Sequence, residues 1–388
     1  MPTVLTPDQL QHDLVLRDLT DPEAGLHAIQ LLVDAAVGAL ASKWKCEIRH
    51  ERGPRVVPLA DNYDRLRYPR ADVTRDARYT RYLDDDHVLR SHASAMIPPA
   101  LARLASNPVD DVLLVCPGIT YRRDAIDRLH TGTPHQLDLW RITRRPMGEA
   151  QLDEMLHVLV DALVPGREWR WERRAHPYTL NGRQVDVRNG NEWVEVWECG
   201  LAHPDVLADA GLDGWSGLAL GMGLDRLLML RKGIPDIRLL RSADARVAEQ
   251  VSDLEPYRPV SHLPAVTRDL SVALAVEDDA EQLGDRIRTA LGHRVDILEA
   301  VTILSETSYA DLPRSARERL GMNEAQKNVL VRLDLRPTDR ALTVAEANSL
   351  RDDVYAAIHQ GSTGQWAGDD GASIRDIRGA QGLGQGSL

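Results

Sequence analysis

Apolar residues recur at helical spacing in two segments of the first half of the chain. Residues 21–40 and 151–163 carry apolar side chains at intervals of three and four, so both segments predict helices. Asp21 and Pro22 suit the first turn of the earlier helix, because Asp caps free N–H groups and Pro at this position needs no N–H partner. Residues 91–104 predict a third helix, interrupted at its paired prolines.

Strand patterns dominate the stretch that follows the second helix. Residues 169–200 form short strand-like runs separated by Asn-Gly pairs at 181–182 and 189–190. Asn-Gly favours the tight turn of an antiparallel hairpin, since both residues tolerate positive φ. A glycine-rich segment then leads into an apolar helix at 223–231, and the earlier apolar run at 112–115 predicts a buried strand.

The last third of the chain has the pattern of a separate α+β unit. Residues 251–262 lack periodicity and contain two prolines, which favours a domain boundary. Strand patterns at 270–276 and 329–335 then alternate with helical patterns at 279–292 and 343–359, the split βαβ order of a ferredoxin-like domain. The predicted parts are an N-terminal extension (1–20), a large first domain (21–250), a linker (251–262), the ferredoxin-like domain (263–377, closed by a strand at 372–377) and a glycine-rich tail (378–388).

Composition narrows the class of protein. Of the 388 residues, 43% are hydrophobic and 27% charged, which is the balance of a folded globular protein. No apolar run reaches the ~20 residues of a membrane helix, and the N-terminus lacks the features of a signal peptide. Cys46, Cys116 and Cys199 are too far apart for a metal site or a disulfide framework. We therefore expect a cytoplasmic protein that does not bind a membrane.

The net charge limits how the protein can contact nucleic acid, and its aromatic content is unusual. The net charge is −12, so any contact with nucleic acid must be local rather than spread over the surface. The chain has no Phe, although it has eight Trp and nine Tyr. Phe packs protein cores as well as these residues do and brings no polar tip. Selection or design against phenylalanine therefore explains its absence better than random drift does.

Arginines with a neighbouring functional group mark two candidate sites. In the segment 116–142, Arg122 lies close to Asp124. A guanidinium can hold a phosphate or carboxylate through two charge-assisted hydrogen bonds, although a salt-bridged hairpin would show the same pattern. Arg226 begins an apolar helix after a glycine-rich segment, where the alternative to a ligand contact is a solvated helix-start arginine.

A carboxylate among aromatic residues marks a third site. Glu195 alternates with Trp193 and Trp197, so the three side chains are expected on one face of a strand. A carboxylate in such surroundings is costly unless it meets a cation. Mg²⁺ on a phosphate and an arginine partner are both compatible with this pattern.

These clusters lie within six segments that resemble, in chain order, the signature motifs of one family. The segments are RSHASAM (90–96), YRRDAIDRLHTGTPHQLD (121–138), WVEVWECGLAHPDVL (193–207), GLALGMGLDRLLML (217–230), GIPDIRLLRSADAR (233–246) and, within 263–377, LPAVTRDLSVAL with QKNVLVRLDLR. The family that they resemble is that of the class II phenylalanyl-tRNA synthetases, in the single-chain mitochondrial layout. The resemblance covers roughly residues 20–377.

This resemblance implies a fold and a reaction. The implied fold is α+β, with a class II synthetase antiparallel sheet flanked by helices in 21–250 and a ferredoxin-like, anticodon-binding α+β sandwich in 263–377. The implied reaction joins phenylalanine to ATP as an aminoacyl adenylate and then transfers the acyl group to tRNA. ATP and Mg²⁺ would be required, and tRNA and phenylalanine or a related amino acid would be the partners. A monomer is expected, with a homodimer as the alternative.

The resemblance also implies roles for individual residues. Arg122 would hold the α-phosphate, and Arg226 would stack on adenine and neutralise the triphosphate, so these two would be the catalytic residues. The other ATP-binding positions would be Asp124, Pro134, Gly223 and Glu195, with Glu195 as the Mg²⁺ ligand. The amino-acid-binding positions would be His92, Ser94, Gln136, Asp138, His176, Tyr178, Leu218, Ala219 and Leu220.

Departures from the family pattern concentrate where the ring of the substrate would lie. The family has Phe where this chain has Pro134, F-P-F-T where it has H-P-Y-T from His176, F-A-F where it has residues 218–220, and Glu where it has Asp138. A general loss of phenylalanine explains most of these changes without a change of substrate. The polar groups of His176 and Tyr178 would instead fit a synthetase paralogue that activates another amino acid or loads another acceptor. A non-catalytic RNA-binding homologue is the third alternative.

Overall fold

The computed structural model describes residues 4–260 and 264–363, which divide into two compact units. Unit 1 is Met1–Arg122 with Gly132–Pro259, and unit 2 is Arg123–Thr131 with Val260–Leu388. The units divide within the segment 251–262, where the sequence pattern predicts a linker. No sequence pattern indicates that residues 123–131 belong with the C-terminal unit.

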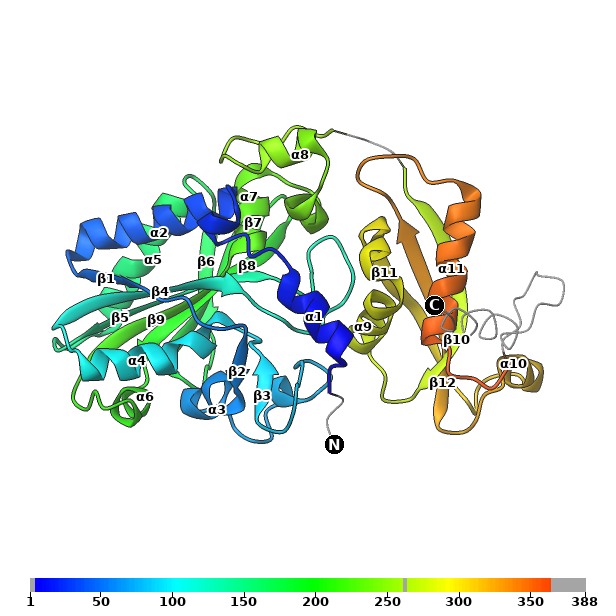
Figure 1. Cartoon of the computed structure of the whole chain (residues 1–388), viewed down its shortest axis with the longest axis horizontal. Coiled ribbons are helices and arrows are strands. Elements are labelled where there is room, and N and C mark those ends of the chain that lie inside the picture. Colours follow the sequence, from blue (N-terminus) through cyan, green and yellow to red (C-terminus); the bar gives the residue numbers. More distant parts are fainter. Residues whose placement is uncertain (1–3, 261–263, 364–388) are drawn as a thin grey trace, which may run out of the picture. The chain divides into compact units, whose positions relative to one another are not determined.

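Unit 1 is built on a seven-stranded sheet with the strand order β1-β4-β5-β9-β8-β7-β6. β1 pairs with β4 in parallel, and all the other neighbours pair antiparallel. Helices α2 and α5 cover one face of this sheet and α4 and α6 cover the other (Figure 1). The strands are β1 (Glu47–His50), β4 (Asp111–Ile119), β5 (His135–Thr143), β6 (Trp169–Arg173), β7 (Thr179–Asn189), β8 (Glu192–Ala202) and β9 (Ser216–Gly223). The helix-flanked, largely antiparallel sheet expected from the sequence is thus confirmed.

The remaining elements of unit 1 surround this sheet. They are α1 (Pro7–Val15), α2 (Ala28–Trp44), α3 (Leu59–Asn62), α4 (Ile97–Ser106), α5 (Glu149–Leu163), α6 (Pro204–Asp209), α7 (Leu224–Lys232), α8 (Ala245–Gln250), the two-stranded sheet β2 (Val56–Pro58) and β3 (His87–Leu89), and short 3-10 turns that include Pro22–Ala24 and Ala93–Met96. The predicted helices at 151–163 and 223–231 correspond to α5 and α7.

Two helix starts differ from the prediction. The helix predicted over 21–40 begins only at Ala28, because Asp21 caps a single 3-10 turn that ends at Gly25 with φ 107°. His27 caps α2 instead, and its Nδ1 accepts the Ile29 N–H at 3.1 Å. In the segment 91–104, the paired prolines lie in the first turn of α4. Prolines are tolerated there because those N–H groups have no partner within the helix, so α4 is not interrupted.

The two Asn-Gly pairs have different structures. The second pair forms the predicted hairpin turn between β7 and β8, with Gly190 at φ 60°. The first pair lies inside β7, where Asn181 has φ 52° and the register with β8 shifts between Leu180 and Arg183. A Cβ on Gly182 would come within 2.1 Å of the Arg174 carbonyl oxygen. The first pair therefore makes a bulge at a close backbone approach, and the hairpin turn predicted there was wrong.

Unit 2 contains a three-stranded antiparallel sheet with the order β10-β12-β11. Its elements are β10 (Val266–Ala275), α9 (Ala280–Leu291), β11 (Leu298–Ser308), α10 (Arg314–Leu320), β12 (Gln326–Leu335) and α11 (Val344–Ile358). The hydrophobic core lies between the sheet and the helices α9 and α11. It includes Val272 and Val331 from the sheet, Ile287 from α9 and Val354 from α11. Thr343 and Glu346 make the predicted capping box of α11. The expected closing strand at 372–377 lies outside the described residues.

The segment Arg123–Thr131 is an integral part of unit 2. Ile126 is buried in the same core as the C-terminal strands. The Val301 N–H donates to the Ile126 carbonyl at 2.8 Å, and the Arg288 guanidinium donates to the carbonyls of Asp124 and Ala125. A loop from the middle of the chain therefore completes the C-terminal unit.

Two glycine substitutions test this packing. We expect Gly284→Ala in α9 to lower the unfolding free energy, because its Cβ would lie 2.7 Å from the Asp124 carbonyl oxygen. Gly38→Ala in α2 is the matched control, since a Cβ there meets nothing within 4 Å and Ala in an open helix position stabilises by ~0.5–1 kcal/mol. Denaturant unfolding of both variants measures the change in unfolding free energy, which should be a decrease for Gly284→Ala and an increase for Gly38→Ala. A stabilised Gly284→Ala protein would contradict the close packing of residues 123–131.

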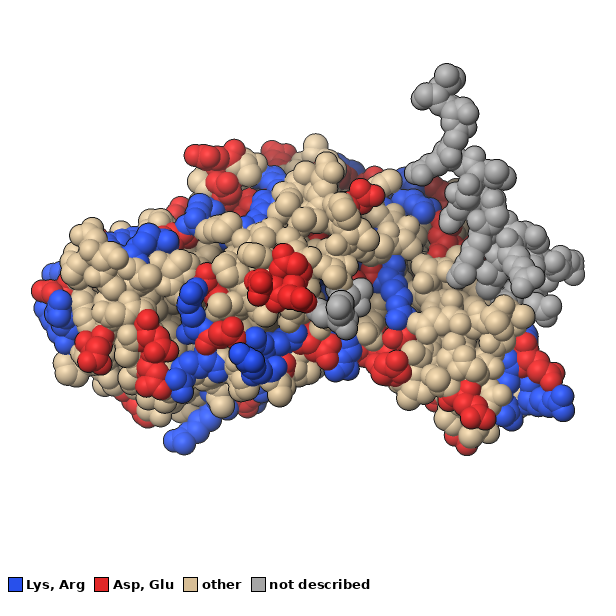
Figure 2. Space-filling model, turned by 60° about the horizontal axis from the view of Figure 1, so that its bottom comes forward, with Lys and Arg blue, Asp and Glu red and all other residues tan. Residues whose placement is uncertain are grey.

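One face of the molecule shows how its charged residues are distributed. On the face in Figure 2, Lys and Arg lie among Asp and Glu without a large field of one sign. Within the described ranges, no helix is both long enough and apolar enough to cross a membrane. Contact with a polyanion would therefore depend on local groups of arginines.

Candidate active site

Strands β5 and β9 place three of the predicted amino-acid-binding residues, Gln136, Asp138 and Ala219, on one face of the sheet. Asp138 is paired with Gly221, which is also paired with Glu198. Gly221 leaves space above the sheet, since a Cβ there would lie 3.3 Å from the Asp138 Oδ1. Gln136 and Ala219 alternate onto the same face. The sheet thus forms a floor on which small residues of β9 lie between carboxylates of β5 and β8.

Asp138 is a buried carboxylate without a cation. It is 2% exposed, and its Oδ2 has no hydrogen-bond partner among the described residues. Burial raises its pKa to about 7, against the opposing effects of Ser94 and Trp140. A buried acid in this state favours a cationic ligand, because an ammonium would restore the interactions that water supplies to a free carboxylate. Gln136 lies nearby and fixes the turn before α4, as its Oε1 accepts the Ala93 N–H at 2.9 Å.

His92 lies at the start of that turn and is also buried. Neither of its ring nitrogens has a hydrogen-bond partner within the described residues. Burial and the nearby charge of Arg122 lower the pKa of His92 to about 4, so the imidazole is neutral near pH 7. A neutral ring with one donor and one acceptor can bind a polar substrate group without adding charge.

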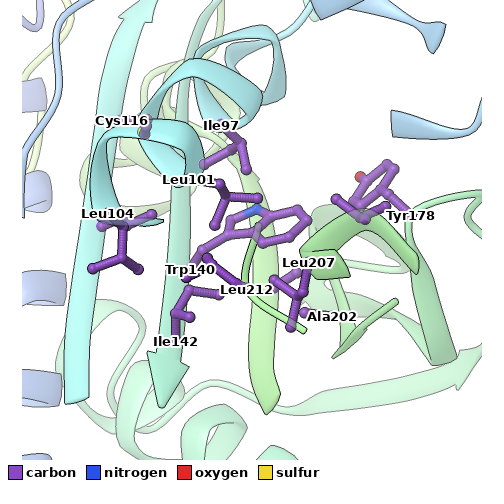
Figure 3. Packing of buried hydrophobic residues seen from close by; sticks show 14 of the residues in the cluster. Ile97, Leu101, Leu104, Cys116, Trp140, Ile142, Tyr178, Ala202, Leu207 and Leu212 are labelled. Carbon is purple, nitrogen blue, oxygen red and sulfur yellow. The ribbon is translucent and has the colours of Figure 1, made fainter. Parts of the chain in front are cut away.

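Aromatic rings form a wall beside Asp138. Tyr178 stacks on Trp140 with centroids 5.9 Å apart and lies 6.1 Å from Tyr68, which in turn stacks on His92 at 5.6 Å. Figure 3 shows Trp140 between α4 residues and Leu207, with Tyr178 to one side. An aromatic wall of this kind suits an aromatic or flat apolar side chain.

Tyr68 and Trp140 were missed by the sequence analysis. Trp140 could have been found, because it follows Asp138 by two positions in a strand and therefore shares its face. Tyr68 lies in an irregular segment after the 3-10 turn Asp64–Leu66, where no periodicity predicts its direction. His176 and Tyr178 do lie together, with ring centroids 5.9 Å apart, and the Glu198 Oε2 lies 3.2 Å from the His176 Nε2.

Two predicted pocket residues lie elsewhere. Leu218 and Leu220 flank Ala219 in β9, so their side chains are directed to the opposite face of the sheet. Both are fully buried. They pack beneath the floor of the site, so the structure does not support direct contact between either leucine and a substrate.

Arginines define the other end of the site. The Arg122 Nε is buried without a hydrogen-bond partner among the described residues, while its backbone N–H donates to the Gly132 carbonyl at 3.0 Å. Arg226 is in the first turn of α7, and Gly223 is the residue that precedes this helix. A Cβ on Gly223 would meet nothing within 4 Å. Next to it, the buried Asp225 accepts from the His135 backbone N–H at 2.5 Å and fixes the start of α7 against β5. Hydrogen bonds therefore fix the backbone at or next to each of these two arginines.

The remaining predicted ATP-binding positions divide between the two units. Pro134 immediately precedes β5 in unit 1, where its carbonyl accepts the Thr120 N–H at 2.8 Å. Asp124 belongs to unit 2, and its carboxylate accepts the Ala125 N–H at 2.9 Å within the loop itself. The expected role of Asp124 at the nucleotide therefore stays a prediction.

Glu195 and Glu198 form a pair of carboxylates near Arg226. Although much of the Glu195 side chain is exposed, partial burial of its carboxylate and then the charge of Glu198 raise its pKa, while Arg226 and Arg174 lower it. Where β8 pairs with β7, Val185 faces Trp197 and Asp186 faces Glu195, so β8 has one extra residue and its strict alternation is interrupted. Sequence spacing alone would therefore place Glu195 and Glu198 on opposite faces. A divalent cation would relieve their repulsion. The described ranges contain no group of three or more Asp, Glu, His or Cys side chains that could hold a metal ion, so substrate oxygens would have to complete the coordination.

The chain matches a family of known proteins. The family "tRNA synthetases class II core domain (F)" matches residues 14–251. A probable mitochondrial phenylalanine–tRNA ligase of Drosophila melanogaster is 28% identical over 361 residues, covering 78% of this chain and 75% of that protein. The phenylalanine–tRNA ligase alpha subunit of a Prochlorococcus marinus strain is 35% identical over 204 residues, covering 52% of this chain and 59% of the subunit.

Among solved structures, a pyrrolysyl-tRNA synthetase of Desulfitobacterium hafniense has a TM-score of 0.43 and 18% identity, covering 55% of this chain and 73% of that one. The family match extends over more than half of the chain and includes every strand of the seven-stranded sheet. The chain therefore belongs to the class II core-domain family of tRNA synthetases, in its phenylalanine (F) branch.

Proposed function

We propose that this protein is a phenylalanine–tRNA ligase, which activates phenylalanine with ATP and transfers it to tRNA. Family membership and the names of the relatives support this function. The observation that carries the proposal is the buried carboxylate of Asp138, whose Oδ2 has no hydrogen-bond partner among the described residues, beside an aromatic wall. An α-amino acid with an aromatic side chain matches both features, because its ammonium pairs with the acid and its ring meets the wall.

The proposed roles follow from the positions of the polar groups. Asp138 and Gln136 bind the α-ammonium group of the amino acid. Arg122 neutralises the substrate carboxylate and the α-phosphate, and a guanidinium is well suited to this because it holds two oxygens at once. Arg226 binds the triphosphate at the start of α7. No side chain has to act as a nucleophile, since positioning and charge neutralisation are sufficient for this chemistry.

In the first step, a carboxylate oxygen of the amino acid attacks the α-phosphorus of ATP, and the bond to the β-phosphate breaks to release pyrophosphate. In the second step, a hydroxyl of the tRNA 3′-terminal adenosine attacks the acyl carbon and AMP leaves. Glu195 and Glu198 would hold Mg²⁺, which neutralises charge on the phosphates when it is bound. Residues of unit 2 would contact the tRNA.

A ring-hydroxylated amino acid is the second candidate substrate. The Tyr178 hydroxyl lies near Ser94, and burial, Tyr68 and Asp138 raise the pKa of Tyr178 well above its usual value. The Trp140 indole N–H has no hydrogen-bond partner of good geometry within the described residues. Polar groups that are left unpaired by phenylalanine could bind a substrate hydroxyl, and an unpaired buried group costs ~1–3 kcal/mol.

Amino-acid-dependent ATP–pyrophosphate exchange tests the function directly. Exchange is measured with each of the standard amino acids and with ring-hydroxylated phenylalanines, followed by transfer to total tRNA. We expect phenylalanine to give the highest kcat/KM. A higher value for a hydroxylated ring would identify the second candidate, and an absence of exchange with every amino acid would leave only a non-catalytic role.

Tyr178→Phe removes only the Tyr178 hydroxyl and so distinguishes the two candidate substrates. We expect this variant to change kcat/KM for phenylalanine by less than about threefold, because an apolar ring does not use the Tyr178 hydroxyl. If a hydroxylated ring binds to that group, the same variant should lose about tenfold for the hydroxylated substrate alone. Parallel exchange assays with both substrates provide the comparison.

The compartment in which the enzyme works remains a prediction. The sequence predicts a cytoplasmic protein, whereas the Drosophila relative is named as mitochondrial. Fractionation of cells that produce the protein at its natural level would decide between the two compartments.

A further inference from the structure

Two buried polar side chains connect strand β5, which carries Gln136 and Asp138, to helix α7, which carries Arg226. His135 is the first residue of β5 and is fully buried, and Asp225 lies buried in the first turn of α7. The Asp225 carboxylate accepts two hydrogen bonds from His135, one from the backbone N–H at 2.5 Å and one from the imidazole Nδ1 at 3.0 Å. Neither side chain contacts a substrate in the proposed reaction.

The hydrogen bonds of His135 determine which of its ring nitrogens carries the proton. Its Nε2 receives the Leu19 backbone N–H at 3.1 Å and the Arg241 guanidinium at 3.1 Å. Because both of these groups can only donate, Nε2 is the acceptor and the proton lies on Nδ1, which donates it to Asp225. Both N–H groups of His135 therefore end on the carboxylate of Asp225.

The first turn of α7 depends on this pair because the helix has no capping side chain. Its N-cap is Gly223, which makes no side-chain hydrogen bond to the N–H groups of that turn. Strand β5, by contrast, is held along its length by β4 on one side and β9 on the other. Loss of the pair should therefore displace the start of α7, and Arg226 with it, more than it displaces Gln136 and Asp138.

We propose that His135 and Asp225 are positioning residues that hold Arg226 in place for the triphosphate of ATP. This inference rests on the role of Arg226 in the proposed function. Arg226 directly follows Asp225 in the chain, so a carboxylate that is fixed to β5 limits where the guanidinium can lie. A displacement of ~1 Å can lower a rate about 100-fold even when its cause is remote from the reacting atoms.

Two substitutions of His135 separate its contact with Asp225 from the other contacts of the ring. The amide of His135→Asn can donate in place of Nδ1. The longer amide of His135→Gln reaches the position of Nε2 instead and leaves Asp225 without its side-chain donor. ATP–pyrophosphate exchange should fall about 100-fold for His135→Gln and less than about threefold for His135→Asn. The Kd for ATP with Mg²⁺, measured by calorimetry, should rise at least about tenfold for His135→Gln alone.

A double variant distinguishes positioning of Arg226 from a general loss of structure. In an Arg226→Ala background, His135→Gln should cause little further loss of exchange, because a residue that acts through Arg226 then has nothing left to position. Asp111→Asn is the matched control, since it disrupts a two-bond contact with Arg141 further along β5. It should lower the unfolding midpoint and leave the Kd for ATP unchanged.

Three results would overturn the proposal: equal losses in the two His135 variants, an unchanged Kd for ATP in His135→Gln, or a loss in the double variant that multiplies those of the single variants. Failure of the proposed function has a different signature. The wild-type protein would then show no exchange with any amino acid, while His135→Gln would still weaken its binding of ATP. That result would support the positioning role of the pair and reject the ligase function.

Discussion

Arg226→Ala should lower the rate of ATP–pyrophosphate exchange by ~10²–10³ while the protein remains folded. Arg226 is half-buried in the first turn of α7, and its charge is felt by Glu195 at the proposed phosphate site. A preorganised cation at this point neutralises charge that develops as pyrophosphate leaves, so its loss acts on the rate rather than on the fold.

Arg231→Ala provides the control for this prediction, because the residue lies in the last turn of the same helix. Exchange by the control should remain close to that of the wild-type protein, and both variants should keep the wild-type unfolding midpoint to within a few degrees. Equal exchange by Arg226→Ala and Arg231→Ala would remove Arg226 from the active site.

Asp138 should make amino-acid binding depend steeply on pH. Burial raises its pKa to about 7, so below pH 7 the free enzyme carries a neutral acid that cannot pair with an ammonium group. KM for phenylalanine should therefore rise about tenfold for each pH unit below 7. Asp138→Asn should remove this dependence and raise KM at pH 8 by at least about 100-fold. Exchange kinetics from pH 5 to pH 8 give both results.

The same carboxylate should reduce the stability of the free enzyme at high pH. Because its folded pKa is raised, its contribution to stability is fully present below the unfolded pKa near 4 and is lost as pH rises through 7. The difference amounts to at most ~4 kcal/mol. Asp138→Asn should therefore be more stable than the wild-type protein at pH 8 but not at pH 4. Asp213→Asn, at an exposed carboxylate, should show no such difference in denaturant unfolding.

Residues in regular strands were the part of the site that the sequence could predict. Gln136 and Asp138 share a face because they are two positions apart in β5, and the family motif already marks them. Arg226 was predictable for a similar reason, since glycines and an apolar helix bracket it. Leu218 and Leu220 show the limit of motif matching, because a matched segment does not say which of its side chains face the site.

Irregular backbone accounts for most of what the sequence could not predict. Tyr68 depends on a turn without periodicity, and the proximity of Glu195 and Glu198 depends on a shifted register. The start of α2 depended on Gly25 and on a histidine cap, which is less common than the Asp cap that the pattern suggested. None of these features follows from a periodic pattern of hydrophobic and polar residues, which is the main signal that the local sequence provides.

The inclusion of residues 123–131 in unit 2 limits how such proteins can be recombined. A single crossover near position 259 would transfer the C-terminal strands but leave Ile126 and the carbonyl of Asp124 behind. The new C-terminal unit would then lack the loop that packs closely against Gly284 and accepts hydrogen bonds from Arg288. A functional chimaera of two relatives therefore requires a double exchange that carries this loop along with the C-terminal unit. The heritable module is thus discontinuous in the gene although it is compact in space.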